Sequence, residues 1–230
     1  MCGRFTLTAR PERVARTFAL SGRLPDLAPR YNIAPTQDVP VVARRGDGTR
    51  GLALLKWGFV PSWANGPTDG VRPINARADS LDKPLFRAAF RTQRCLIAAD
   101  GFYEWATAGK RKVAHHFRLA DGEPFGIAGL WSHWTDGAAK LTTCCLITTT
   151  PNELVSTVHD RMPAVLPADV WDRWLDPATP VAGLSGLLRP YPADGMVSAA
   201  VGPAVNRAGY DGPDCLTPAD ANRPAAGCLF

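Results

Sequence analysis

Four residues have side chains suited to catalysis: Cys2, Asn75, Glu104 and His159. Removal of the initiator methionine before a small residue would leave Cys2 first in the mature chain, with an α-amine and a thiol on adjacent carbons. An α-amine has an ordinary pKa of about 7.7–8.0 and keeps a reactive neutral fraction at pH 7, whereas a lysine amine at about 10.4 keeps very little. The start of the chain therefore offers a nitrogen and a sulfur nucleophile side by side.

Glu104 lies in an aromatic run, Gly101-Phe-Tyr-Glu-Trp105. The alternation of a strand places Phe102 and Glu104 on one face and Tyr103 and Trp105 on the other. A carboxylate flanked by aromatic residues lies either at a solvated sheet edge or in a partly desolvated pocket that raises its pKa. The spacing alone favours neither.

Asn75 and His159 also allow more than one interpretation. Asn75, in Pro73-Ile-Asn-Ala-Arg-Ala-Asp79, could simply cap a turn. His159 follows a predicted short helix and could be a solvated histidine favoured by the helix dipole. Its neighbour Arg161 could pair with Asp160 or point at a phosphate.

The elements that must position these residues are mostly strands. Apolar alternation and β-branched residues predict strands over residues 3–8, 39–43, 52–57, 95–99, 102–105, 113–119, 125–131, 141–149, 164–166 and 196–201. Helical spacing predicts helices over residues 11–20, 80–93 with Ser80 as the cap, 153–159, 168–175 and 183–188. Residues 58–73 are expected to form a loop.

This succession predicts one α+β domain over residues 2–217. Its sheet should be mostly antiparallel and curved into a barrel-like core flanked by short helices. The Gly-, Pro- and Ala-rich residues 218–230 are expected to form a flexible tail.

Composition narrows the classes of partner. The chain of 230 residues has no apolar run of the roughly 18 residues that a membrane span needs, so no membrane partner is expected. Residues 1–166 contain 22 basic and 14 acidic residues, a net charge of +8, and residues 167–230 have a net charge of −3. Of the 26 basic residues 21 are Arg, whose planar fork suits phosphate oxygens. A nucleic-acid partner for the first two thirds is one interpretation, and general Arg richness is the other.

The six cysteines show no CxxC pair and no metal-ligand spacing, so neither zinc nor any other cofactor is expected. Cys95, Cys144 and Cys145 lie in apolar runs, where a reduced cysteine behaves as a small buried hydrophobe. The first residues carry no secretory signal, which predicts a reducing, cytoplasmic compartment without structural disulfides.

Seven short segments form a distinctive series along the chain: Cys2-Gly-Arg-Phe5, Asn32-Ile-Ala-Pro-Thr-Gln37, Trp57-Gly-Phe-Val-Pro-Ser-Trp63, Asn75-Ala-Arg77, Arg94-Cys-Leu-Ile-Ala-Ala-Asp-Gly-Phe-Tyr-Glu-Trp105, Ala128-Gly-Leu-Trp131 and His159-Asp-Arg-Met-Pro163. In wording and order the series resembles the SRAP family, whose members are called SOS response-associated peptidases or abasic-site processing proteins. The resemblance extends from Cys2 to about Asn206.

The resemblance implies a domain that binds single-stranded DNA and crosslinks covalently to an abasic site through its N-terminal cysteine, as part of the DNA damage response. At the matching positions Cys2 is the nucleophile, Asn75 orients the site, Glu104 is the acid or base and His159 donates a proton near the sugar oxygen. Further matching positions face the DNA or the site, and they are Arg4, Asn32, Arg77 and Arg161.

The implied chemistry suits these residue types. The ring-opened sugar of an abasic site presents an aldehyde, to which the α-amine of Cys2 can add to give an imine. The neighbouring thiol can then close a five-membered thiazolidine, a case of catalysis by proximity. Trp57, Phe59 and Trp63 could stack on bases beside the gap, and binding should be independent of sequence and weakened by salt.

Two other functions remain open from the sequence. One is a cysteine peptidase, with Cys2, His159 and Glu104 as nucleophile, base and orienting group, which could also remove Met1 from its own chain. The other is a non-covalent reader of modified DNA bases. For any of the three we expect a monomer that associates with the nucleoid when it is on DNA.

Overall fold

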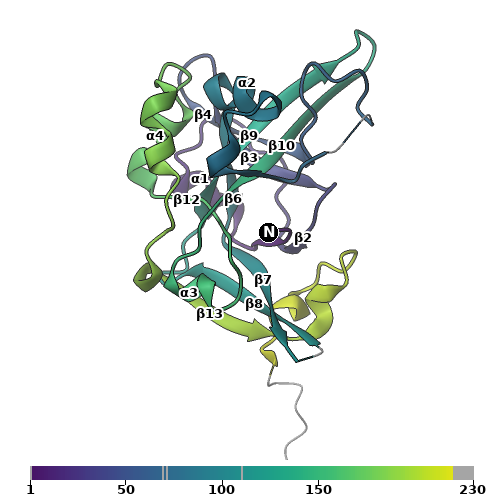
Figure 1. The fold of residues 1–230 in the computed structure, drawn as a ribbon, viewed down its shortest axis with the longest axis vertical. Coiled ribbons are helices and arrows are strands. Elements are labelled where there is room, and N and C mark those ends of the chain that lie inside the picture. Colours follow the sequence, from purple (N-terminus) through teal and green to yellow (C-terminus); the bar gives the residue numbers. More distant parts are fainter. Residues whose placement is uncertain (1, 69, 71, 110, 220–230) are drawn as a thin grey trace, which may run out of the picture.

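The computed structural model describes residues 2–68, 70, 72–109 and 111–219, which build two sheets around one large apolar core (Figure 1). The smaller sheet has five strands, in the spatial order β13 (Met196–Val201), β8 (Arg111–Leu119), β7 (Gly101–Ala108), β1 (Phe5–Leu7) and β2 (Arg30–Ile33).

The larger sheet has the order β11 (Met162–Pro163), β10 (Lys140–Thr149), β4 (Arg50–Trp57), β3 (Asp38–Arg44), β6 (Arg94–Ala99), β9 (Phe125–Thr135) and β12 (Val165–Leu166), and β5 (Asn75–Arg77) pairs with β10. Because β9 also pairs with β10, the strands β10, β4, β3, β6 and β9 close into a barrel. The pairings of β10 with β4 and β5 are parallel, and the other pairings between strands are antiparallel. The predicted α+β fold with a mostly antiparallel, barrel-like sheet is confirmed.

The helices are short: α1 (Pro11–Thr17), α2 (Pro84–Thr92), α3 (Glu153–Ser156) and α4 (Trp171–Leu175). The predicted helix over residues 80–93 is wrong in its first turn. Pro84 occupies the first turn of α2 and favours an extended backbone at Lys83, so the helix cannot run back to Ser80, which is not its cap. The predicted helix over residues 183–188 is instead two 3₁₀ turns, Val181–Gly183 and Ser185–Leu187.

Strand β6 of the barrel is covered on both of its faces. All six residues of β6 are buried, as expected of a strand covered on both faces. One residue, Asp100, separates β6 in the barrel from β7 in the smaller sheet. The chain therefore passes from one sheet to the other at this corner.

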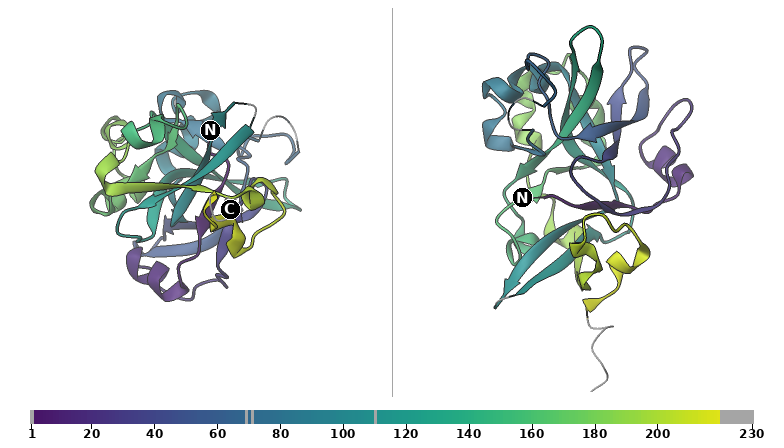
Figure 2. Two further views of the ribbon diagram at one scale, coloured as in Figure 1. Left: turned by 90° about the horizontal axis from the view of Figure 1, so that it is seen from below. Right: turned by 90° about the vertical axis from the view of Figure 1, so that its right-hand side faces the viewer.

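The last described segment lies beside the smaller sheet, as both views in Figure 2 show. It consists of two 3₁₀ turns, η6 (Pro203–Asn206) and η7 (Pro213–Leu216), which contact β8 and β2. Within the described residues no helix is long and apolar enough to cross a membrane. Of the tail predicted for residues 218–230, only residues 218–219 are among those described.

Candidate active site

The N-terminal segment meets β5 and β7 at one point between the two sheets. Cys2 is fully buried, and its backbone carbonyl accepts a 2.8 Å hydrogen bond from the side-chain amide of Asn75. Asn75 does not cap a turn: it begins strand β5, directly opposite Leu146 of β10. The barrel thus presents an amide that holds the backbone of the predicted nucleophile.

Glu104 lies in the desolvated environment, not at a solvated edge. Its side chain is 3% exposed, and burial raises its pKa from 4.5 to about 7. Burial, and next to it the charge of Glu104, raises the pKa of the Cys2 thiol. The thiol and the carboxyl group therefore belong to one electrostatic site.

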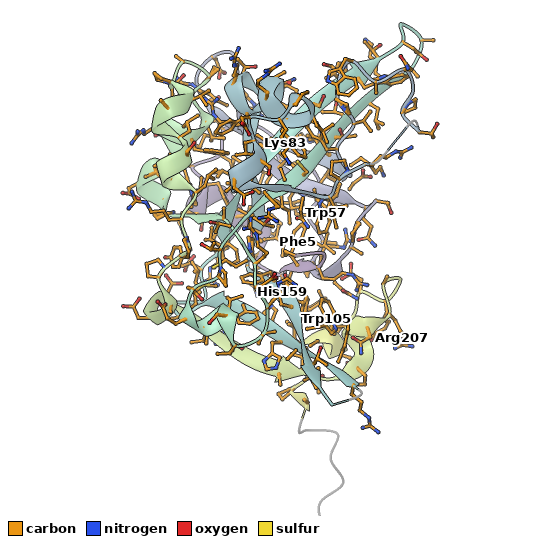
Figure 3. The ribbon with its side chains drawn as sticks, in the orientation of Figure 1. Phe5, Trp57, Lys83, Trp105, His159 and Arg207 are labelled. Carbon is orange, nitrogen blue, oxygen red and sulfur yellow. The ribbon has the colours of Figure 1, made fainter. Side chains whose placement is uncertain are left out.

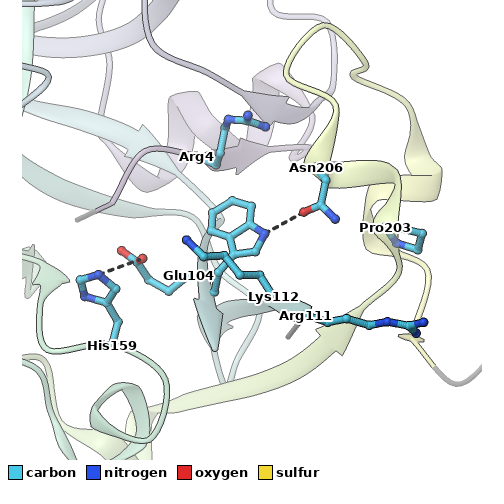
Figure 4. A pocket seen from close by; sticks show the side chains of 8 residues that line it. Arg4, Glu104, Arg111, Lys112, His159, Pro203 and Asn206 are labelled. Carbon is cyan, nitrogen blue, oxygen red and sulfur yellow. Dashed lines mark hydrogen bonds and ion pairs between the residues drawn. The ribbon is translucent and has the colours of Figure 1, made fainter. Parts of the chain in front are cut away.

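His159 faces Glu104 from the loop after α3. Its Nε2 lies 3.9 Å from Oε2 of Glu104, and a dashed line in Figure 4 marks this contact. The backbone N–H of Arg161 donates to Nδ1 of the ring at 3.0 Å, which in a neutral ring leaves the proton on Nε2, toward Glu104. The Asp160 carboxylate, 2.9 Å from Nδ1, becomes a partner only when the ring is doubly protonated. Because burial lowers the pKa of His159, the neutral form is favoured at pH 7.

Two arginines lie near one another at the edge of this site. Arg161 donates to the backbone oxygen of Thr148 at 2.7 Å, and Arg77 pairs with Asp79. Burial, and then the charge of Arg77, lowers the pKa of Arg161. Among the described residues, the buried Nε of Arg161 and the buried Oδ1 of Asn75 have no hydrogen-bond partner. Arg161 could therefore donate, and Asn75 could accept, a further hydrogen bond at this site.

A cavity of about 740 Å³ opens beside Glu104 (Figure 4). Its lining is rich in cations and is formed by Arg4, Glu104, Trp105, Arg111, Lys112, His159, Pro203 and Asn206. The guanidinium of Arg4 lies 6.0 Å from the centre of the Trp105 ring, and the Trp105 indole donates to Oδ1 of Asn206 at 2.8 Å. The predicted site residues did not include Trp105 and Asn206. Alternation places Trp105 on the face opposite Glu104, and only the tertiary fold brings Asn206 to it.

Asn32 is predicted to face the DNA or the site, and the structure places it behind Arg4 and not in the lining of the cavity. Its side chain is fully buried, and its amide donates to the backbone oxygens of Val205, Arg207 and Tyr210 at 2.8–3.2 Å. Its Oδ1 accepts a 2.8 Å bond from Arg4. Asn32 therefore holds one wall of the cavity and orients the arginine.

The three predicted stacking residues separate into two groups. Trp57 is fully buried and packs edge-on against Phe5 at 5.3 Å, and both residues are labelled in Figure 3. Its indole donates to the Ile74 oxygen. Phe59 is 1% exposed and packs on Phe86. Because neither ring reaches solvent, their prediction as base-stacking residues is wrong. Trp63 is 63% exposed and stays a predicted DNA contact.

The described cysteines and acidic residues show no sign of a metal centre. Cys2, Cys95, Cys144, Cys145 and Cys215 are free and buried. Within the described part of the chain no three His, Cys, Asp or Glu side chains are grouped so as to hold a metal ion.

Comparisons with known proteins agree with the motif series. Residues 1–208 match the family described as SOS response associated peptidase (SRAP). The chain is 39% identical over 222 residues to the abasic site processing protein YoqW of Bacillus subtilis, covering 94% of this chain and 99% of the relative. It is 30% identical over 269 residues to the abasic site processing protein HMCES of Gallus gallus, covering 97% and 80%.

Solved structures share the fold. A protein from Bacteroides thetaiotaomicron superposes with a TM-score of 0.85 at 24% identity, over 94% of this chain and 99% of that one. A phage-related protein from Bordetella bronchiseptica superposes with a TM-score of 0.70 at 30% identity, over 87% and 94%.

Proposed function

The chain belongs to the SOS response associated peptidase (SRAP) family, and from that membership we propose that it processes abasic sites in single-stranded DNA by crosslinking to them through Cys2. Relatives covering most of the chain are named abasic site processing proteins. The observation that carries the proposal is the grouping of Cys2, held by Asn75, with the desolvated carboxyl of Glu104.

In the proposed reaction, the α-amine of Cys2, freed by loss of Met1, adds to the C1′ aldehyde of the opened sugar. Loss of one water gives an imine, and the thiol sulfur then bonds to the imine carbon while its proton is transferred, by way of Glu104, to the nitrogen. The product is a thiazolidine, and the net change is one aldehyde and one aminothiol joined with release of one water. No oxidant or cofactor takes part.

Glu104 serves as the proton carrier because a carboxyl group with a pKa of about 7 is present in both forms at neutral pH. His159 is the proton donor to the sugar oxygen during ring opening in its protonated form, which the Asp160 carboxylate 2.9 Å from Nδ1 stabilises. Asn75 holds the Cys2 backbone, so the nucleophile is presented in one orientation.

The cations around the cavity supply the DNA contacts. Arg4, Arg111 and Lys112 line the cavity, and Arg161, whose backbone N–H donates to His159 of the lining, lies close to Arg77. Such contacts bind phosphates without reading sequence, so affinity should fall as salt rises. An abasic sugar has no base to recognise, which fits a site that binds the phosphates of the DNA backbone.

A cysteine peptidase is less well supported by the geometry. The thiolate is the nucleophile in that chemistry, and here burial raises the pKa of the Cys2 thiol. The imidazole of His159 faces Glu104, and its pKa is lowered by burial.

A denaturing gel tests the proposal. The protein is mixed with a single-stranded oligonucleotide containing one abasic site, and with the same strand without the lesion. We expect a heat-stable shifted band for the abasic strand alone. A Gly inserted before Cys2 should prevent thiazolidine formation because the α-amine then belongs to another residue, and an undiminished band from that variant would refute the proposed chemistry.

A further inference from the structure

The carboxylate of Asp100 binds the segment that follows the nucleophile. One oxygen, Oδ1, accepts from the hydroxyl of Thr6 at 2.6 Å. The other, Oδ2, accepts from the backbone N–H and the hydroxyl of Thr8 at 2.6 and 2.8 Å, and from the backbone N–H of Ala9 at 2.9 Å. Asp100, at the corner between the barrel and the smaller sheet, thus receives four hydrogen bonds from residues 6–9.

These bonds act beside a short and irregular strand pairing of β1. Strand β1 has only three residues, Phe5–Leu7, and its register with β2 shifts between Phe5 and Leu7. A slip of one residue in a strand turns every side chain to the opposite face. For β1 such a slip would carry Cys2 away from Glu104. The Asp100 carboxylate replaces the ladder bonds that a longer strand would have.

A second contact makes the register specific. Thr6 lies directly opposite Gly101 in the pairing of β1 with β7, and the imidazole of His116 lies across that glycine. A Cβ on residue 101 would come within 2.0 Å of Nε2 of His116 and 2.8 Å of Oγ1 of Thr6. Glycine at position 101 therefore provides the space in which these two side chains meet.

The hydrogen bonds run in one direction through this cluster. The Thr6 hydroxyl gives its proton to Asp100, so its oxygen accepts from Nε2–H of His116, 3.2 Å away. Burial has the largest effect on the pKa of His116 and lowers it to about 4. The charges of Asp100, which raises this pKa, and of Arg118, which lowers it, have smaller effects. The imidazole is neutral at pH 7, and its single proton is engaged with Thr6.

The cluster is connected to the nucleophile through the backbone. Three residues, Gly3, Arg4 and Phe5, separate Cys2 from Thr6 along the chain. Between them the oxygen of Arg4 accepts from the backbone N–H of Tyr103 at 3.0 Å and lies 3.7 Å from the Cys2 thiol. The register held at Thr6 therefore determines where Cys2 lies relative to β7.

We propose that Asp100, Thr6, Gly101 and His116 form a register lock that holds β1 so that Cys2 is presented to Glu104. They are positioning residues and do not touch DNA. The inference rests on the proposed function, because the reaction that the lock serves is crosslinking by Cys2.

The test compares buried threonines in the two sheets. Thr6→Val removes the hydroxyl of the lock with little change in shape, and Thr6→Ser keeps it. Thr143→Val is the matched control, because Thr143 is 1% exposed and its hydroxyl accepts from Val60 N–H at 2.9 Å within the barrel. Single-turnover crosslinking to an abasic single strand is measured over a range of DNA concentrations, at matched fractions of folded protein.

We expect Thr6→Val to lower the maximal rate by about 10- to 100-fold, the loss that a small misplacement of a reacting group causes. The half-saturating DNA concentration should stay unchanged, Thr6→Ser should restore most of the rate, and Thr143→Val should leave both values as in the parent. Equal maximal rates for Thr6→Val and Thr143→Val would overturn the lock.

Hydrogen exchange separates this inference from the proposed function. In DNA-free protein, amides of residues 3–9 should exchange faster in Thr6→Val than in Thr143→Val. If the parent forms no adduct, the proposed function fails, and the exchange experiment still decides whether the lock orders β1. Unchanged exchange in residues 3–9 would overturn the lock whatever the adduct assay shows.

Discussion

Cysteines are buried both in the closed barrel and beside the five-stranded sheet, yet only Cys2, beside the sheet, belongs to the proposed reactive site. In the barrel, Cys95 and Cys145 are fully buried among aliphatic side chains, and burial raises the pKa of both thiols. Cys2, beside the smaller sheet, is equally buried and its pKa is also raised. What differs is the neighbours: Cys2 has the Asn75 amide and the Glu104 carboxyl, whereas among the described residues the pKa values of Cys95 and Cys145 respond to burial, to other thiols and to the Leu130 backbone. Burial and a shifted pKa alone therefore do not identify the nucleophile.

The largest expected difference between the two regions appears when one cysteine is removed from each. Cys2→Ala should abolish the heat-stable adduct with abasic single-stranded DNA, because the α-amine can still form an imine but no thiol remains to close the ring, and the imine hydrolyses. Cys145→Ala should leave the crosslinking rate within about twofold of the parent, at a modest loss of stability from the small cavity. Denaturing gels measure both, and an adduct surviving in Cys2→Ala would move the chemistry to another residue.

Glu104→Gln should slow crosslinking by about 100-fold, the usual scale of general acid–base catalysis. In the parent, the maximal rate should rise with pH as the α-amine loses its proton and fall above about pH 7 as Glu104 ionises. The variant should lack the falling limb. A rate–pH profile that keeps this limb in Glu104→Gln would assign it to a different group.

The same residue predicts a pH-dependent stability difference. The folded state holds the proton of Glu104 more tightly than the unfolded state, so its cost to stability is absent below pH 4.5 and grows as pH rises to about 7. Because glutamine cannot ionise, Glu104→Gln should gain stability relative to the parent over that window, by up to roughly 3 kcal/mol. Urea denaturation at pH 5 and pH 8 measures the change, and an equal difference at both pH values would contradict it.

A smaller effect, on stability, is expected from substituting Asn32, which holds one wall of the cavity. Asn32→Ala removes the amide that donates to three backbone carbonyls and leaves the Tyr210 oxygen without it, so it should lower the free energy of unfolding by about 2 kcal/mol. Amides of residues 203–217 should then exchange faster, whereas Thr143→Val in the barrel should leave that segment unchanged. Exchange that rises evenly over the whole chain would show that Asn32 does not act on this wall in particular.

The smallest predicted effect is on DNA affinity. Trp63→Ala should weaken binding to single-stranded DNA by about 1 kcal/mol, roughly fivefold, if the exposed ring stacks on a base. Leu54→Ala, which removes another exposed apolar side chain, is the control and should leave affinity unchanged. Fluorescence anisotropy with an intact strand measures both, and equal affinities for the two variants would remove Trp63 from the interface.

The strands of both regions were largely predictable: the sequence indicates four of the five in the smaller sheet, with β2 missed, and all five of the closed barrel. The barrel strands alternate or run continuously apolar, so the hairpin of β3 and β4 and the strands β6, β9 and β10 follow from the pattern of residues. Strand β5 could not be predicted, because its three residues are defined by parallel pairing with β10, some seventy residues later. Pairing over such a distance leaves no local signal.

The site shows the same division. The residue types of Cys2 and Glu104 indicated chemistry, but the choice between a solvated edge and a desolvated pocket needed the tertiary structure. Trp57 and Trp63 lie in one Gly- and Pro-rich stretch, and the sequence could not separate them. The difference arises because the Trp57 indole finds the Ile74 oxygen 2.8 Å away and packs on Phe5, while Trp63 has 63% of its surface exposed.

The intact mass of the protein after incubation with an abasic oligonucleotide tests the central claim most directly. We predict a species with the mass of the chain without Met1 plus the opened strand, less one water, and fragmentation that places the bond on Cys2. An adduct on a chain that keeps Met1, a bond on another residue, or only the separate masses of protein and DNA would contradict the account.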